Sequence, residues 1–264
     1  KHVDARLKIG WVHTDYTRER LDIDFERHTW TELDRIATVS GSVRDSFVTV
    51  FPELEEMMFV AENCFDPLLV QEQSREPHPA LNSVAERPGH VLCTVGRLAY
   101  PKAFDVAIDA CEQLILKDMP VTWLAVGYGP EEASLRQKVR EKGLEDSFIM
   151  VGKQANPYPF MAAADLYVQP SRYEGKAVAV REAQTLGRPV LITNFPTAAS
   201  QLRDGFDGVI CNSTPEALAT QIKRLLDDPS LRDRLAANAA ANDYSNQDSA
   251  LDLVSQIRTL LDAR

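Results

Sequence analysis

Glu174 and Glu182 stand directly after a short apolar run, Leu166–Gln169, with seven residues between them. The order of strand, turn and helix places both at the carboxyl end of a strand, where open α/β sheets bind their ligands. On a helix this spacing separates the two carboxylates by about 12 Å along the axis. Carboxylates accept hydrogen bonds from paired hydroxyls. The spacing therefore suits a ligand with two polyol parts, and a nucleotide sugar is such a ligand.

The alternative is that both glutamates belong to a solvated helix face, where glutamate is common. The surrounding residues favour a ligand site instead. Lys176 and the free N–H groups at the start of the helix attract an anion, and Gly175 allows close approach to the backbone. Gly187, followed by Pro189, predicts the end of the helix before the next strand.

Two cations follow the strand that ends at Val95, and they predict a phosphate site. Arg97 offers a fork for two phosphate oxygens, whereas Lys102 offers a point charge. A diphosphate leaving group develops negative charge as a sugar departs, and fixed cations stabilise that charge. The alternative is two solvated surface residues, and the neighbouring Gly96 favours the phosphate loop.

Residues 173–193 resemble the signature of the retaining glycosyltransferases of the GT-B fold, in the large family 4 (glycosyl transferases group 1). That signature is a Glu, seven residues, a second Glu, and a Gly-Pro entry into a strand. The variant Glu174-Gly175-Lys176 is similar to bacterial surface-polysaccharide members. The resemblance covers residues 90–260 well and residues 7–66 moderately. It extends to the motifs Thr94–Leu98 with Lys102, Gly127–Pro130, Val151–Lys153 and Ala164–Leu166.

The resemblance implies roles for the matching donor-site residues. Glu174 would hold the hydroxyls of the donor hexose, and Glu182 would bind the ribose. The backbone of Lys153 and Gln154 would meet the base. The remaining donor contacts would be backbone groups of the phosphate loop and the helix start: Gly96, Gly175, Lys176 and Ala177.

The resemblance also implies a set of catalytic residues: His13, Arg97, Lys102 and Glu174. A lone histidine is more often structural, but the family places one at this strand end, facing the donor sugar, and Asp15 is a second polar candidate. The implied reaction is front-face attack with retained anomeric configuration, in which the leaving phosphate helps to take the acceptor proton. No metal and no cofactor is implied. One departure is Ala103, where the family usually has glycine; its methyl would crowd the loop slightly but favour the helix.

Alternation of strand and helix after residue 89 predicts an α/β fold. The expected strands are 90–95, 121–126, 148–151, 166–169, 190–193 and 208–211, and the helices between them are 104–116, 131–142, 157–163, 177–186 and 197–202. The resemblance makes this a complete C-terminal Rossmann-like domain with a six-stranded parallel sheet, accompanied by a remnant of the N-terminal Rossmann-like domain.

The expected organisation has four parts. Residues 1–66 are the closing βα units of the N-terminal, acceptor-side domain, with a helix over 42–51 capped by Ser42. Residues 67–88, with four prolines, are the linker. Residues 89–245 bind the nucleotide sugar, and residues 246–264 form a helix that packs back on the N-terminal part. Relative to the family, about a hundred N-terminal residues are absent, so a complementing N-terminal segment or chain is an expected partner.

Bulk properties exclude several classes of protein. A net charge of −10 over 264 residues argues against a nucleic-acid partner and a polybasic membrane patch. No apolar run approaches the ~20 residues that span a bilayer. The four cysteines and five histidines lack metal-ligand spacing. We expect a cytoplasmic protein, with peripheral contact at the inner face of the membrane left open.

The sequence thus predicts a hexosyltransferase that acts on a nucleotide sugar and a glycan or lipid-linked acceptor. Two alternatives stay open. One is a non-catalytic sugar-nucleotide-binding subunit that needs a partner chain. The other is a GT-B sugar-nucleotide epimerase, which would form product without any acceptor.

Overall fold

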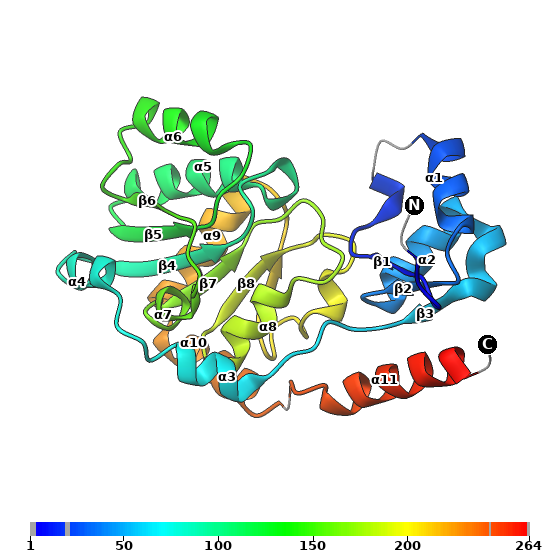
Figure 1. Cartoon of the computed structure of the whole chain (residues 1–264). Coiled ribbons are helices and arrows are strands. Elements are labelled where there is room, and N and C mark those ends of the chain that lie inside the picture. Colours follow the sequence, from blue (N-terminus) through cyan, green and yellow to red (C-terminus); the bar gives the residue numbers. More distant parts are fainter. Residues whose placement is uncertain (1–3, 19–21, 243, 263–264) are drawn as a thin grey trace. The chain divides into compact units, whose positions relative to one another are not determined.

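The computed structural model describes residues 4–18, 22–242 and 244–262. The chain divides into two compact units, which Figure 1 shows as ribbons. Unit 1 comprises Lys1–Asp66, Glu174–Lys176 and Ser245–Arg264, and unit 2 comprises Pro67–Tyr173 and Ala177–Tyr244.

Unit 2 contains the predicted six-stranded parallel sheet, in the order β6-β5-β4-β7-β8-β9. This is the doubly wound order, in which the strand order reverses between the two central strands, here β4 and β7. The strands are β4 (His90–Val95), β5 (Val121–Val126), β6 (Phe148–Gly152), β7 (Leu166–Gln169), β8 (Val190–Thr193) and β9 (Val209–Cys211). All six lie where the sequence predicts strands, so the α/β fold class is confirmed.

Successive residues of each strand in unit 2 bury opposite faces of the sheet, because side chains alternate along a strand. On β5, Trp123 packs on one face and Leu124 on the other. Helices α5 (Phe104–Ile115), α6 (Glu132–Glu141) and α9 (Pro215–Asp227) cover the Trp123 face. Helices α7 (Tyr158–Ala162) and α8 (Val178–Thr185) cover the other. Burial on both faces explains the nearly continuous apolar runs of these strands.

The proline-rich stretch 67–88 forms two short helices, α3 (Pro67–Gln73) and α4 (Pro79–Ala85), within unit 2. In each helix a proline occupies the first position, where its missing N–H costs no hydrogen bond. Helix α10 (Pro229–Ala240) begins in the same way, with the Asp228 side chain accepting a hydrogen bond from Leu231 N. Pro67, Pro79 and Pro229 therefore each begin a helix.

Unit 1 contains a three-stranded parallel sheet in the order β1 (Ile9–Val12), β2 (Arg35–Thr38) and β3 (Met58–Val60). Its core joins these strands to α2 (Gly41–Val50) through Val12, Ile36, Val43 and Phe47. The cap of α2 is Ser40, whose Oγ accepts a hydrogen bond from Val43 N at 3.2 Å. The predicted cap, Ser42, is therefore wrong by two residues and lies inside the helix.

Two further helices belong to unit 1. Helix α1 (Ile23–Thr31) begins after Asp22, whose carboxylate accepts from Phe25 N. Helix α11 (Gln247–Asp262) is preceded by Asn246. The Asn246 side chain accepts from Phe65 N at 2.8 Å and donates to Asn63 O at 2.7 Å, which ties the start of α11 to the chain that follows β3.

Candidate donor-binding site

Three loops at the carboxyl ends of β4, β5 and β6 are hydrogen-bonded side by side in unit 2. Gly96 N donates to Val126 O at 3.0 Å, and Gly127 N donates to Gly152 O at 2.9 Å. Gly127 adopts a φ of +146°, and a Cβ there would overlap the carbonyl oxygen of Gly96. Glycine at 127 therefore allows two strand-end loops to touch backbone to backbone, which leaves their N–H and C=O groups at the edge that binds ligands in such sheets.

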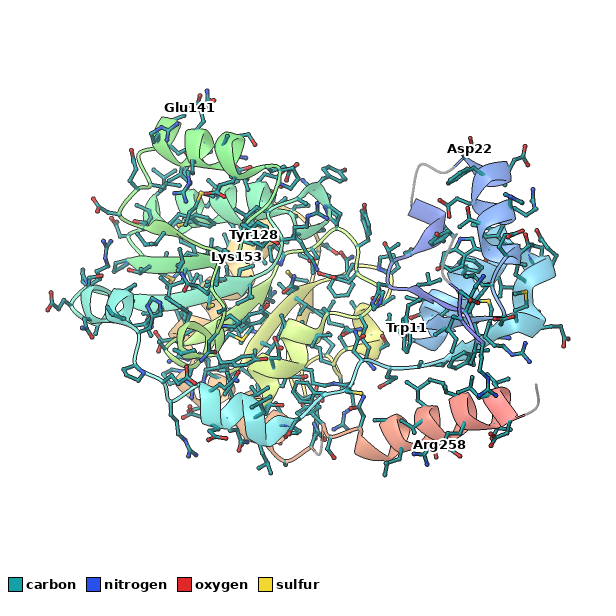
Figure 2. All side chains as sticks on the ribbon, in the orientation of Figure 1. Trp11, Asp22, Tyr128, Glu141, Lys153 and Arg258 are labelled. Atoms are coloured by element: carbon teal, nitrogen blue, oxygen red, sulfur yellow. The ribbon has the colours of Figure 1, made fainter. Side chains whose placement is uncertain are left out.

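These loops line an open pocket of about 240 Å³. Tyr128 and Lys153 line this pocket, and Figure 2 labels both side chains. The Lys153 Nζ lies 4.9 Å from the centre of the Tyr128 ring. Apolar walls, backbone groups and one exposed aromatic ring suit a planar heterocyclic ligand. The pocket is lined by Val95, Gly96, Arg97, Val126, Gly127, Tyr128, Lys153, Gln154 and Pro157.

The two predicted phosphate-binding cations flank the end of β4. Arg97 is exposed at the pocket. Lys102 ends a short 3-10 helix, Tyr100–Lys102, and its aliphatic stem runs along Gly96, since a Cβ there would lie 3.5 Å from Lys102 Cδ. The structure therefore brings Arg97, Lys102 and Gly96 together at one end of the central strand, as a phosphate-binding loop requires.

Ala103, directly after Lys102, adopts the left-handed conformation with φ 51° and ψ 42°. It is the cap residue before α5, fully buried, and not part of the helix. The expectation that its methyl group favours the helix is therefore wrong. A left-handed conformation costs a residue with a Cβ about 1–2 kcal/mol.

Ala103→Gly is expected to change the stability of the protein by less than about 1 kcal/mol, because relief of this strain offsets both the loss of a buried methyl group and the added flexibility of glycine in the unfolded chain. Urea unfolding measures the change. The matched control is Ala110→Gly in the interior of α5, equally buried and unstrained, where the same substitution should destabilise by about 2 kcal/mol. Equal destabilisation at both positions would contradict the strain argument.

Glu182 lies on α8, half-buried, and accepts a hydrogen bond from the Tyr158 hydroxyl at 3.0 Å. Burial raises the pKa of the Glu182 carboxyl above its ordinary value, and the hydrogen bond from Tyr158 offsets part of the rise. Burial, followed by the charge of Glu182, raises the pKa of Tyr158 to about 12. The phenol therefore stays protonated at neutral pH and orients one oxygen of the carboxylate, which leaves the other oxygen for a ligand hydroxyl.

Glu182→Gln is expected to gain stability relative to the native protein as the pH rises from 4 to 8. A carboxyl whose folded-state pKa is raised contributes stability below its unfolded pKa and loses it as the pH rises through the folded value. Glutamine carries no charge and still accepts from Tyr158. Melting temperatures of both proteins across this range test the prediction, with Glu141→Gln as the control on an exposed carboxylate of α6. A difference that does not vary with pH would contradict it.

The loop Glu174–Lys176 belongs to unit 1. Glu174 is buried, and Lys176 Nζ lies 2.5 Å from Glu62 Oε1. Gly175 packs against the backbone of His13, whose carbonyl oxygen occupies the space that a Cβ at 175 would need. The structure therefore brings three predicted residues together (His13, Gly175 and Lys176), and the close backbone approach at Gly175 is made by the protein itself.

The remaining predicted residues have protein partners. Asp15 is buried and accepts hydrogen bonds from Thr17 N at 3.0 Å and Thr17 Oγ1 at 2.7 Å. Ala177 N donates to Gln201 Oε1 at 3.2 Å. Gln154 Nε2 donates weakly to Val151 O at 3.4 Å. Bonds of this kind hold the strand-end loops in shape before any ligand arrives.

Residues 82–242 match the protein family described as "Glycosyl transferases group 1". The chain belongs to this family. Over 159 residues it is 31% identical to the alpha-D-kanosaminyltransferase of Streptomyces kanamyceticus, a match that covers 59% of the chain and 40% of that enzyme. Over 171 residues it is 29% identical to the lipopolysaccharide core glycosyltransferase LpsD of Rhizobium meliloti, covering 64% and 49%. The matches thus span about half the length of these relatives.

Solved structures share the fold of this chain. Anabaena Alr3699/HepE in complex with UDP superposes with a TM-score of 0.79 at 20% identity, covering 95% of this chain and 72% of that one. At that identity the likeness shows the fold alone. It confirms the predicted GT-B architecture.

Three side chains at the candidate site were not among the predicted contacts: Tyr128, Tyr158 and Arg172, although Tyr128 lies within the predicted motif Gly127–Pro130. Tyr128 lies between two glycines at a strand end, a position that favours an exposed ring. Tyr158 and Arg172 carry no such signal, because their partners are 24 and 67 residues away in the sequence. Among the described residues, no His, Cys, Asp and Glu side chains form a group of three or more that could hold a metal ion. No helix in the described part of the chain is long and apolar enough to cross a membrane.

Proposed function

We propose that this glycosyltransferase is a retaining hexosyltransferase of family 4 that takes its hexose from a nucleoside-diphosphate sugar. The observation that carries the proposal is the grouping at the carboxyl edge of the sheet in unit 2. There a pocket for a planar base lies next to Arg97 and Lys102, in the part of an α/β sheet where nucleotides bind. Glu182, with one oxygen held by Tyr158, adds an acceptor for the ribose hydroxyls.

The charges of the site suit departure of a diphosphate. Arg97 and Lys102 would stabilise the negative charge that develops on the leaving group. Glu174 would hold hydroxyls of the transferred hexose. Attack from the same face as the leaving group retains the anomeric configuration, and the departing phosphate would take the proton of the acceptor hydroxyl. This route needs no carboxylate nucleophile.

The names of similar proteins support the proposed donor and the proposed class of acceptor. HepE has been crystallised with UDP and with UDP-glucose, which favours a uridine-diphosphate sugar as donor. LpsD acts in lipopolysaccharide core biosynthesis, which favours a glycan or lipid-linked acceptor. Calorimetric titration of the chain with UDP, ADP, GDP and CDP tests donor binding. Absence of binding to all four would contradict the proposal.

Arg97→Ala and Lys102→Ala are each expected to weaken nucleoside-diphosphate binding by about 1–3 kcal/mol, the range for hydrogen bonds to charged groups. The reason is that each variant removes one cation next to the proposed diphosphate. Calorimetry with UDP measures the loss. The control is Arg136→Ala on α6, which removes an equal charge from an i,i+4 surface pair with Glu132. If both site variants bind as tightly as this control, the phosphates lie elsewhere.

A further inference from the structure

Arg172 bridges the two loops that follow β4 and β7, the neighbouring strands between which the strand order of the sheet in unit 2 reverses. It follows β7, whereas its partners follow the neighbouring strand β4. Arg172 N donates to Pro101 O at 2.8 Å, and Arg172 Nη1 donates to Tyr100 O at 2.8 Å. Both carbonyls belong to the turn that carries Lys102. A single residue thus fixes the backbone of the lysine turn from across the switch point of the sheet.

The same guanidinium forms a bidentate ion pair with Asp105. Arg172 Nη1 and Nη2 lie 2.9 and 2.6 Å from the two carboxylate oxygens, and the guanidinium stacks 4.3 Å from the centre of the Tyr100 ring. A fork that meets both oxygens of a carboxylate has a fixed geometry that lysine does not reproduce. The side chain of Arg172 is only 24% exposed, so water screens the pair incompletely.

The position of Asp105 explains why its charge is paired. It lies in the first turn of α5, three residues after Lys102. Burial by itself would raise the pKa of the Asp105 carboxyl, but Arg172, with a smaller contribution from Lys138, brings it below its ordinary value. Asp105 is therefore an anion next to a loop that we propose binds another anion, and an unpaired charge there would repel a diphosphate and attract Lys102.

We propose that Arg172 and Asp105 form a positioning pair for the donor diphosphate: Arg172 holds the lysine turn in its binding geometry and neutralises the carboxylate beside it. This inference rests on the proposed function. It makes Arg172 a residue that acts through Lys102 and through charge, without touching the nucleoside. The affinity for a diphosphate should therefore depend on Arg172, and the affinity for the bare nucleoside should not.

The test compares UDP with uridine, and in parallel ADP with adenosine, by calorimetry and NMR titration of the 264-residue chain. Arg172→Ala is expected to weaken diphosphate binding about tenfold and to leave the nucleosides within about twofold. Asp105→Asn should tighten diphosphate binding, because it removes the repelling charge. The double variant should recover part of the loss, and Arg172→Lys should lie between alanine and the native residue.

The two single variants should change diphosphate affinity in opposite directions, and this distinguishes a positioning role from a merely structural one. A pair that only supports the fold would weaken binding in both single variants and for nucleosides as well. Lys142→Ala is the matched control, since its ion pair to α5 has the same 24% exposure and lies farther along the helix, at Asp109 and Glu112. Thermal melts check folding, and if Arg172→Ala does not fold, Arg172→Lys and Asp105→Asn carry the comparison.

The outcomes also separate the two proposals. If the native chain does not prefer UDP or ADP over their nucleosides, the proposed function falls and this inference falls with it. If the native chain prefers the diphosphate and Arg172→Ala keeps the same preference, only the positioning role is overturned.

Discussion

Trp123→Ala is expected to destabilise unit 2 by about 3–5 kcal/mol, the range for removing a large aromatic side chain from a core. Trp123 is fully buried on β5, with its ring centre 5.7 Å from that of Phe148. Its Nε1 donates to Thr94 Oγ1 at 2.9 Å, and the same hydroxyl donates to Val168 O at 2.7 Å. The indole therefore fills space under α5 and completes a polar chain across β5, β4 and β7.

Urea unfolding, followed by circular dichroism, measures this loss. Trp123→Phe is the matched control, because it keeps a six-membered aromatic ring in the core and removes the N–H donor with only part of the indole volume. It should cost about 1–2 kcal/mol. If the alanine variant loses no more stability than the phenylalanine variant, the cavity left by the indole is unimportant, and the core is less tightly packed than the structure shows.

The sheet of unit 2 could be predicted from sequence because its strands have a strong local signal. Strands buried on both faces are apolar at most successive positions, and 121–126 and 190–193 are apolar except for one threonine each. The helices between them follow from the same alternation. The position of the proposed phosphate loop also follows from the sequence, since Gly96, Arg97 and Lys102 come soon after a predicted strand.

The features that escaped prediction depend on contacts that sequence spacing does not encode. Serines at 40 and 42 are equally good caps by type, and only the backbone of the folded chain selects Ser40. The conformation of Ala103 is imposed by the turn before it, against the preference of the residue. The Arg172–Asp105 pair joins residues 67 positions apart, and an arginine beside a predicted loop is ordinarily a solvated residue.

Gly127→Ala is expected to destabilise unit 2 by about 3 kcal/mol and to weaken UDP binding at least tenfold. The φ of +146° at this position is strained for any residue with a Cβ, at a cost on the order of 1–3 kcal/mol. The added methyl would also overlap the Gly96 carbonyl oxygen, and overpacking costs about 1–3 kcal/mol more. Backbone atoms cannot rotate away as a flexible side chain can, so one loop must move.

Movement of the loop at Gly96 or of the loop at Gly127 would distort the proposed donor site. A shift of Gly96 weakens its hydrogen bond to Val126 O and displaces the backbone along which the Lys102 stem lies. Gly143→Ala is the matched control, because Gly143 also has a positive φ, +63°, but a Cβ there would meet nothing within 4 Å. That variant should lose about 1–2 kcal/mol of stability from strain alone and bind UDP normally. Parallel urea unfolding and UDP calorimetry decide the matter: if the two variants lose UDP affinity equally, close contact between the strand-end loops does not shape the binding site.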